Sequence, residues 1–120
     1  MCSAPEYCPT RLLVCSELVL LGDDDEFLGE GTSTQYAADS VCNKYGNYGS
    51  KYSATSIFNP YGTYGSSYST LSAYSTYAFT PPSLYCVTTD TKLNAVSKNT
   101  SIANAVDPDL LCAALEASGL

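Results

Sequence analysis

The sequence predicts a small α+β protein, in which an antiparallel sheet from two β-hairpins carries an irregular Tyr/Gly/Ser repeat insertion and a short C-terminal helix. Three observations predict this class. Related apolar segments flank the middle of the chain, a 16-residue repeat lies between them, and a capped apolar stretch lies near the end. With 120 residues, the chain fits a single domain, 1–120.

The two predicted hairpins occupy residues 11–30 and 84–98. A shift of 66 positions lays residues 18–29 on residues 84–95, so that Leu18 meets Leu84 and Leu21 meets Val87. Each segment reads as an apolar strand, a polar turn and a second strand, which is the pattern of a β-hairpin. We therefore expect the two hairpins to pair into one antiparallel sheet.

Residues 35–80 contain three copies of the 16-residue repeat, in which tyrosines and small hydroxyl-bearing residues recur in register. Glycines in the Tyr-Gly-x-Tyr-Gly part predict turn positions with positive φ. A unit with one aliphatic residue cannot bury itself, so the units are expected to pack on one another or on the flanking segments. The aligned residues include Tyr36, Tyr52 and Tyr68; Ser40, Ser56 and Ser72; Val41, Ile57 and Ala73; and Tyr45, Tyr61 and Tyr77.

A short helix is predicted over residues 107–118. Asp107 is a favourable N-cap residue, and Pro108 suits the first helical position. Leu111 and Leu115 belong to an apolar stripe that ends before Gly119. The helix is therefore expected to dock on the sheet.

The chain is acidic, with a formal net charge of -7 and a pI near 4.1. Phosphate backbones and anionic lipids are repelled by such a charge, so nucleic acid is not an expected partner. The apolar run over residues 12–21 is interrupted by Ser16 and Glu17 and is too short for a membrane helix, so the chain is not expected to be transmembrane. Histidine, the commonest general base, is absent, and we expect neither an enzyme nor a cofactor.

Six cysteines in so short a chain favour disulfides and an oxidising compartment, with buried free thiols as the alternative. The start of the sequence lacks the basic residues of a secretory signal, so either a signal is missing from it or the protein is cytoplasmic. Of these, an extracellular or cell-envelope location is the interpretation that we favour.

No metal site is predicted. The cysteines form no Cys-x-x-Cys motif, and without histidine a zinc site has little support. The acidic run at residues 23–26 carries carboxylates that calcium prefers, but it lacks the alternating spacing of a calcium loop. A solvated hairpin turn is the favoured interpretation of this run.

The tyrosines are the main candidates for a binding surface, because their rings and the nearby Asn amides can contact a sugar, a peptide or another protomer. The structural alternative is a packed ladder, in which Tyr45, Tyr61 and Tyr77 stack between successive units. The candidate binding residues are Tyr45, Tyr48, Tyr61, Tyr64, Tyr77, Asn43 and Asn59.

The run Asp-Ser-Val-Cys-Asn-Lys-Tyr-Gly-Asn-Tyr-Gly-Ser-Lys-Tyr-Ser at residues 39–53, followed by Ser-Ile-Phe-Asn-Pro-Tyr-Gly at 56–62, resembles a family of small bacterial proteins with Tyr-Gly-x-Tyr-Gly-Ser-x-Tyr-Ser repeats. The resemblance covers residues 26–82 and implies frequent export, but no established activity. It implies aromatic packing at Phe58 and Tyr74, where such repeats often have Trp. Members often carry cysteines near the positions of Glu30 and Ser33, which this chain lacks, so Cys42 must be free or paired elsewhere.

Together these features predict a non-enzymatic extracellular or envelope module that is built on Tyr-rich repeats and self-assembles into a homo-oligomer or filament. The alternative, from another class, is a glycan- or peptide-binding module that uses the Tyr and Asn face. A small hydrolase is the least favoured interpretation, because no base and no recognisable nucleophile setting is present.

Overall fold

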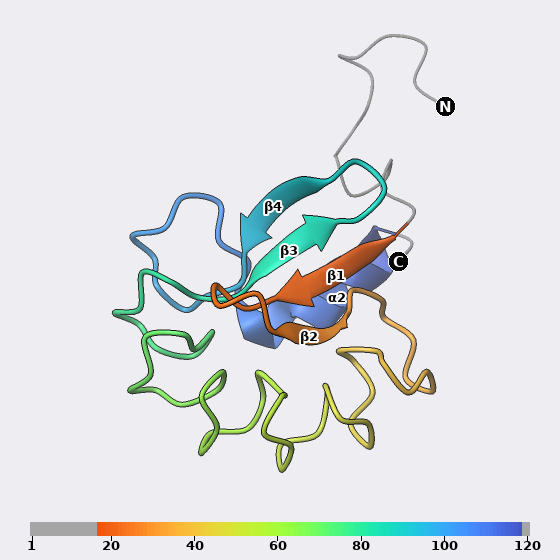
Figure 1. Cartoon of the computed structure of the whole chain (residues 1–120), viewed down its shortest axis with the longest axis horizontal. Helices are drawn as coiled ribbons and strands as arrows, with labels where there is room; N and C mark the ends of the chain where they lie inside the picture. The colour runs from red at the N-terminus through yellow and green to blue at the C-terminus, as the bar shows by residue number, and fades with distance from the viewer. Residues whose placement is uncertain (1–16, 119–120) are drawn as a thin grey trace, which may run out of the picture.

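The computed structural model describes residues 17–118 and contains a four-stranded antiparallel sheet with the order β2-β1-β3-β4 (Figure 1). The strands are β1 (Leu18–Leu21), β2 (Phe27–Glu30), β3 (Ser83–Cys86) and β4 (Thr91–Ala95). A 3-10 turn, η2 (Pro108–Leu110), leads into the short helix α2 (Leu111–Ala117). The predicted small α+β class, with an antiparallel sheet and a short C-terminal helix, is confirmed. The part of the first predicted hairpin at residues 11–16 lies outside the described residues.

The centre of the sheet joins strands from either side of the repeats, because β1 pairs directly with β3. Leu20 lies opposite Leu84 and Val19 opposite Tyr85. Side chains alternate between the faces of a strand, so Leu18, Leu20 and Leu84 point together into the core and are at most 2% exposed. The chain leaves the sheet after β2 and re-enters it at β3, which lies beside β1.

Most of the intervening chain is a succession of tight turns, and we call residues 35–80 the turn coil. The N–H of Ser53 donates to the carbonyl of Ser50, and the N–H of Ser56 donates to that of Ser53, at 3.3 and 3.2 Å. Each such bond closes a β-turn of the i to i+3 type. In Figure 1 these turns form an arc of small loops, coloured yellow to green, beneath the sheet.

The spacing of these turns accounts for the 16-residue period. Four turns follow at three-residue steps and are then succeeded by one four-residue step, from Gly46 to Ser50 and from Gly62 to Ser66. At these steps the Ser50 and Ser66 N–H groups donate to the Gly46 and Gly62 carbonyls, at 3.1 and 3.0 Å. The longer step restores the same turn pattern 16 residues later.

Side chains close the same turns a second time, which explains why Ser and Asn recur at their first positions. The Ser56 Oγ accepts the N–H of Phe58 at 3.0 Å, and the Asn59 Oδ1 accepts the N–H of Tyr61 at 3.0 Å. These are ST- and Asx-turns, in which a short polar side chain replaces water as the partner of a backbone N–H. Ser50, Ser53, Ser66, Ser69, Ser72, Ser40 and Asn43 make the equivalent bond.

The prediction that the coil glycines take positive φ is wrong. These glycines instead allow two stretches of backbone to lie close together. Among the described residues, Gly29 is the one glycine with positive φ. A Cβ at Gly49 would collide with the Asn43 carbonyl oxygen, and a Cβ at Gly65 would collide with the Asn59 carbonyl oxygen. The four-residue step brings two stretches of backbone so near that no side chain fits between them.

The hydrophobic core lies between the sheet, the turn coil and α2. Val41, Ile57 and Ala73, which are 16 residues apart, are each 0% exposed. They pack with Leu20 and Leu28 of the sheet and with two leucines of the helix, in one cluster of buried residues. Each repeat therefore contributes one aliphatic side chain to a shared core. The helix leucines are Leu111 and Leu115.

A second row of coil side chains attaches the C-terminal segment. Cys42 forms a disulfide with Cys112 across 70 residues of sequence, with the two Cα atoms 5.9 Å apart. Phe58 packs edge-on against Tyr74 with ring centroids 6.3 Å apart, and the Tyr74 hydroxyl donates to Asp109 at 2.7 Å. These three coil residues are again 16 apart, so successive units present a disulfide and two aromatic rings to η2 and α2.

Candidate functional site: two rows of exposed tyrosines

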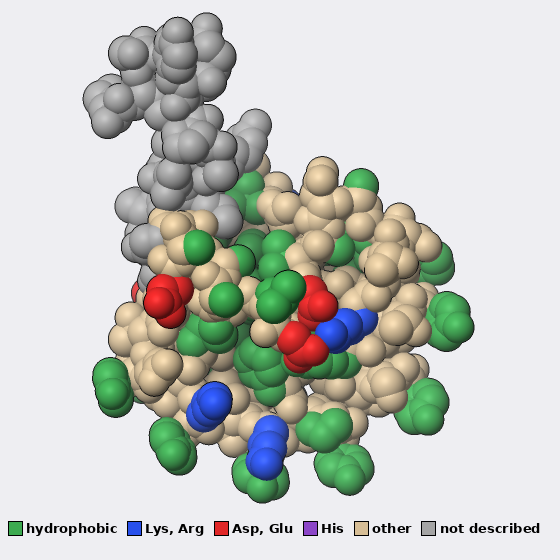
Figure 2. Space-filling view, turned by 180° about the vertical axis from the view of Figure 1, so that it is seen from behind, with side chains coloured by type: hydrophobic (Ala, Val, Ile, Leu, Met, Phe, Trp, Pro, Cys, Tyr) green, Lys and Arg blue, Asp and Glu red, His purple; other side chains and the backbone are tan. Residues whose placement is uncertain are grey.

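Six tyrosine side chains of the coil project into solvent, with exposed fractions from 82% to 97%. We call them the tyrosine rows, and each row has a 16-residue spacing. Figure 2 shows hydrophobic side chains that project around the lower rim of the molecule, with the acidic side chains set away from that rim. One row is Tyr36, Tyr52 and Tyr68, and the other is Tyr45, Tyr61 and Tyr77.

Position within the turn explains this exposure. Tyr52 and Tyr61 are each the third residue of a turn whose first residue is Ser50 or Asn59, and that first residue accepts the tyrosine N–H. This hydrogen bond fixes the backbone of each tyrosine, while its ring projects into solvent. The predicted ladder of Tyr45, Tyr61 and Tyr77 packed between units is therefore wrong, because these rings are 97%, 95% and 87% exposed.

Tyr48 and Tyr64 of the candidate set point toward the sheet instead. The Tyr48 ring packs edge-on against Phe27, with centroids 5.0 Å apart. Tyr64 is 8% exposed, and its hydroxyl donates to the Asp24 carboxylate at 2.6 Å. Burial and this hydrogen bond to a carboxylate raise the pKa of Tyr64 above its ordinary value of 10.0. Tyr64 is therefore buried away from any contact face, and Tyr48 is half-buried.

Asn43 and Asn59 organise the coil. The Asn43 amide donates to the Ala37 carbonyl at 2.9 Å, and the Asn59 amide donates to the Ser53 carbonyl at 3.1 Å. Their Oδ1 atoms accept the N–H groups of Tyr45 and Tyr61, both at 3.0 Å. Both polar atoms of each amide are thus engaged inside the coil, so these residues position the backbone that carries the rings.

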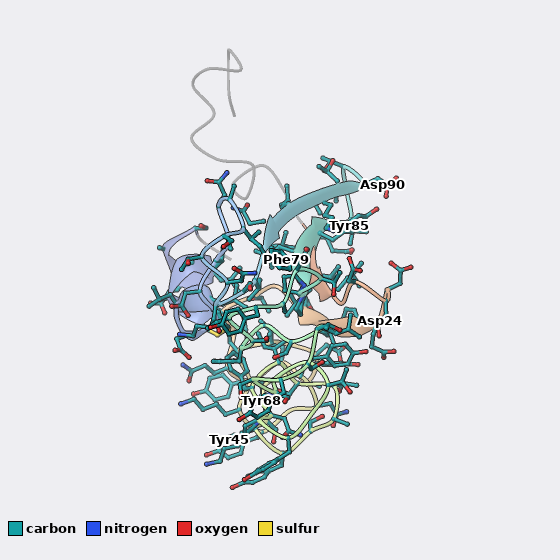
Figure 3. The ribbon with its side chains drawn as sticks, turned by 90° about the vertical axis from the view of Figure 1, so that its left-hand side faces the viewer. Asp24, Tyr45, Tyr68, Phe79, Tyr85 and Asp90 are labelled. Carbon is teal, nitrogen blue, oxygen red and sulfur yellow. A yellow bond between two sulfur atoms is a disulfide. The ribbon has the colours of Figure 1, made fainter. Side chains whose placement is uncertain are left out.

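Sequence reasoning omitted Tyr36, Tyr52 and Tyr68 from the candidate binding residues, although their spacing was recognised. They are 91%, 82% and 94% exposed. Both rows have the same 16-residue period in the sequence. This shared period was a signal that the two rows belong in one set of candidate binding residues. Figure 3 labels one member of each row: Tyr45 and Tyr68 lie in the coil below the sheet, nearer the side of α2, whereas Asp24 lies on the opposite side of the molecule.

A notch separates the Tyr52 and Tyr61 rings. It has a volume of about 450 Å³ and is lined by these two rings together with Lys51, Asn59 and Pro60. Two aromatic rings that flank a shallow recess can hold a flat, partly apolar group between them. The notch is thus the best-defined contact point that the rows offer.

Charge is segregated along the chain. Between Asp39 and Asp90 there is no Asp or Glu, while Lys44 and Lys51 lie in the coil. The region that carries most of the tyrosines is therefore neutral to slightly positive in a protein whose net charge is -7. A partner of the rows meets hydroxyls, rings and two ammonium groups, and no carboxylate of the coil from residue 40 onward.

The acidic turn at residues 23–26 has a role inside the fold. Asp24 accepts the Tyr64 hydroxyl through Oδ2 and the Glu26 N–H through Oδ1, at 2.6 and 3.3 Å. Asp25 takes a positive φ of 66°, which Asp tolerates better than most residues. Over residues 17–118, no group of three or more His, Cys, Asp or Glu is arranged to hold a metal ion.

The cysteines of the described region are oxidised. Besides the pair Cys42–Cys112, Cys86 is disulfide-bonded, and no cysteine within residues 17–118 is a free thiol. In that same stretch, no helix has the length and apolar character needed to cross a membrane. Disulfides persist mainly in oxidising compartments.

Searches against protein-family models, curated proteins and solved structures found no match to this chain.

Proposed function

We propose that this protein is a non-enzymatic, extracellular or envelope-associated binding module for an uncharged polysaccharide. It is built from three 16-residue repeats inserted between two hairpins, and it contacts the polymer through the tyrosine rows. The observation that carries the proposal is the near-complete exposure of six regularly spaced rings, from 82% to 97%. The disulfides of Cys42 and Cys86 support the location outside the cytosol.

Tyrosine suits a sugar partner because its ring packs on the C–H face of a pyranose while its hydroxyl reaches the sugar hydroxyls. The rows hold the rings on backbone that is closed twice at each turn, by a main-chain bond and by a Ser or Asn side chain. Little backbone entropy is then lost on binding. A regular polymer matches a regular row, because several weak contacts of one kind add along a single chain.

Binding to insoluble polysaccharides tests the proposal directly. We expect depletion of the purified protein from solution by cellulose, chitin or a β-1,3-glucan, with little dependence on salt because the contacts are uncharged. The double variant Tyr61→Ala/Tyr68→Ala should lower the affinity roughly tenfold, at about 0.5–1.5 kcal/mol for each ring contact. The matched control is Phe79→Ala, an aromatic residue that is 75% exposed but lies beside the sheet (Figure 3).

Two results would contradict the glycan proposal. One is the absence of depletion by all three polymers, and the other is an equal effect of the Phe79 variant and the double tyrosine variant. The double variant should keep the far-UV circular dichroism and the thermal midpoint of the wild type, because both rings lie outside the core.

Self-assembly is the second candidate function, and the same exposed rings favour it. Rows on one copy can pack against rows on another, and the scarcity of charge in the coil removes a barrier to such contact. Sedimentation velocity over a range of concentrations separates the two functions. Assembly predicts concentration-dependent species that the Tyr61→Ala/Tyr68→Ala variant loses, whereas a monomer at every concentration excludes this candidate.

A further inference from the structure

A groove runs between the first part of the turn coil and the start of the C-terminal helical segment. Its volume is about 730 Å³, and its lining is mainly apolar. The half-buried Phe58 and Cys112 and the exposed rings of Tyr45 and Tyr52 supply its accessible apolar surface, over a buried floor of Val41, Cys42 and Pro108. This volume lies within the range of small-molecule sites in proteins, about 300–1,000 Å³.

The groove differs from the notch between Tyr52 and Tyr61 because its two walls come from different segments of the chain. It is lined on one side by residues of the coil and on the other by residues of η2 and α2, held together by the disulfide between Cys42 and Cys112. Figure 2 shows hydrophobic side chains gathered on this face between lysine and acidic side chains. The walls are thus covalently linked, and the site is present before any ligand arrives.

Two ammonium groups line the coil side. Lys44 and Lys51 both line the groove, and within residues 17–118 neither forms an ion pair. The Lys51 ammonium lies over the Tyr52 ring, 5.4 Å from its centroid. Because few basic residues are present in this chain, two unpaired lysines at one groove are a marked local excess of positive charge.

The Asp109 carboxylate on the opposite wall does not neutralise the two lysines, because both of its oxygens already accept hydrogen bonds from other residues. Asp109 accepts the Tyr74 hydroxyl through Oδ1 at 2.7 Å and the Lys98 ammonium through Oδ2 at 2.6 Å. Lys98, followed by the Tyr74 hydroxyl, holds the pKa of the Asp109 carboxyl below its usual value. A cationic ligand would find no free carboxylate here, whereas an anionic ligand finds two free ammonium groups.

We propose that this groove binds an amphipathic carboxylate, a molecule with one acid group and an aliphatic or aromatic body. The body lies on Phe58, Cys112 and the rings of Tyr45 and Tyr52, and the acid group meets Lys44 and Lys51. The groove shares Tyr45 and Tyr52 with the tyrosine rows of the proposed glycan contact, but its apolar floor and its two lysines are its own. Tyr61 and Tyr68, whose replacement tests that contact, do not line the groove.

Isothermal titration with three ligands that share one tail tests the proposal: decanoate and decyltrimethylammonium below their micellar concentrations, and decanol below its solubility limit. Decanoate should bind with one-to-one stoichiometry and more tightly than the other two. Added salt should weaken decanoate binding selectively, because the lysines are near the surface. Equal affinity for the three ligands, or no binding of decanoate, overturns the proposal.

Variants locate the site within the molecule. Lys44→Gln/Lys51→Gln should lower decanoate affinity about tenfold, since each exposed ion pair is weak but two act together. Lys92→Gln is the matched charge control, because Lys92 is exposed and lies away from this groove. Tyr45→Ala should also lower the affinity, whereas its repeat equivalent Tyr61→Ala should leave it unchanged.

The variant results decide the location. An unchanged affinity in the Lys44/Lys51 variant, or equal losses in the Tyr45 and Tyr61 variants, overturns the assignment. In amide NMR spectra of the wild type, decanoate should shift the signals of Val41, Lys51 and Cys112. Shifts confined to the residues around Phe79, which line a different recess, would also overturn it.

Discussion

Removal of the Cys42–Cys112 disulfide should lower the free energy of unfolding by about 4 kcal/mol. The bond closes a loop with a sequence separation of 70, and loop-closure entropy in the unfolded chain gives about this magnitude for such a length. Replacing only one of the two cysteines would leave an unpaired thiol on the other. The appropriate variant is therefore Cys42→Ala/Cys112→Ala, which leaves no free thiol at either position.

The loss should concentrate in the C-terminal segment. The α-helix has seven residues, and isolated helices of that length are unstable in water. Its remaining attachments include the packing of Leu111 and Leu115 in the core. The η2 segment that precedes it is held by the hydrogen bond from Tyr74 to Asp109 and by the ion pairs of Lys98 with Asp107 and Asp109. Without the disulfide, amide exchange in the helix should accelerate more than amide exchange in β1 and β3.

Urea unfolding of the oxidised wild type and the double variant measures the effect. The midpoints should differ by the free-energy change divided by the slope m, and a larger m for the variant would report a more expanded unfolded chain. A difference below about 1 kcal/mol would refute the entropic reasoning, given the loop length. Uniform acceleration of exchange across the sheet and helix would refute the idea that the bond chiefly secures the C-terminal segment.

Three further predictions concern the coil. Tyr61→Ala should change the free energy of unfolding by less than about 0.5 kcal/mol, because the ring is 95% exposed; thermal unfolding checks this, and a large loss would mean that the ring packs after all. Gly65→Ala should destabilise by about 1–3 kcal/mol, because its Cβ would overlap the Asn59 carbonyl oxygen; a neutral result in urea unfolding would contradict the close approach. The raised pKa of Tyr64 means that the folded state favours the neutral phenol, so its contribution is complete below pH 10 and falls as the pH rises above that value. Tyr64→Phe should therefore show a shallower loss of stability above pH 10 than the wild type, and equal slopes would rule out this linkage.

Local chemistry made several elements predictable. The Asp107 and Pro108 pair marks the start of the C-terminal helical segment, and the Asp107 carboxylate accepts the Asp109 N–H at 2.9 Å as an N-cap does. The apolar segments that begin at Leu18 and Leu84, each followed by a polar turn, marked strands of the sheet. These features depend on neighbours within a few residues, which the sequence displays directly.

The candidate site was less predictable, since the direction in which a ring points depends on the whole coil. Tyr61 and Tyr64 are three residues apart, yet one is 95% exposed and the other 8%. Both lie in the same Tyr-Gly-x-Tyr-Gly motif, so composition and spacing treat them alike. Their difference arises because Tyr64 meets Asp24 of the turn between β1 and β2, a partner 40 residues away.

By itself, the sequence determined the period and chemistry of the turns. Each turn is closed by hydrogen bonds that span two to four residues, and Ser or Asn at the first position supplies one of them. Only the tertiary structure decided which rings face solvent and that Cys42 pairs with Cys112. Those outcomes need the coil to lie against the sheet and α2, and contacts between distant segments form only when the shared core of Val41, Ile57 and Ala73 is buried.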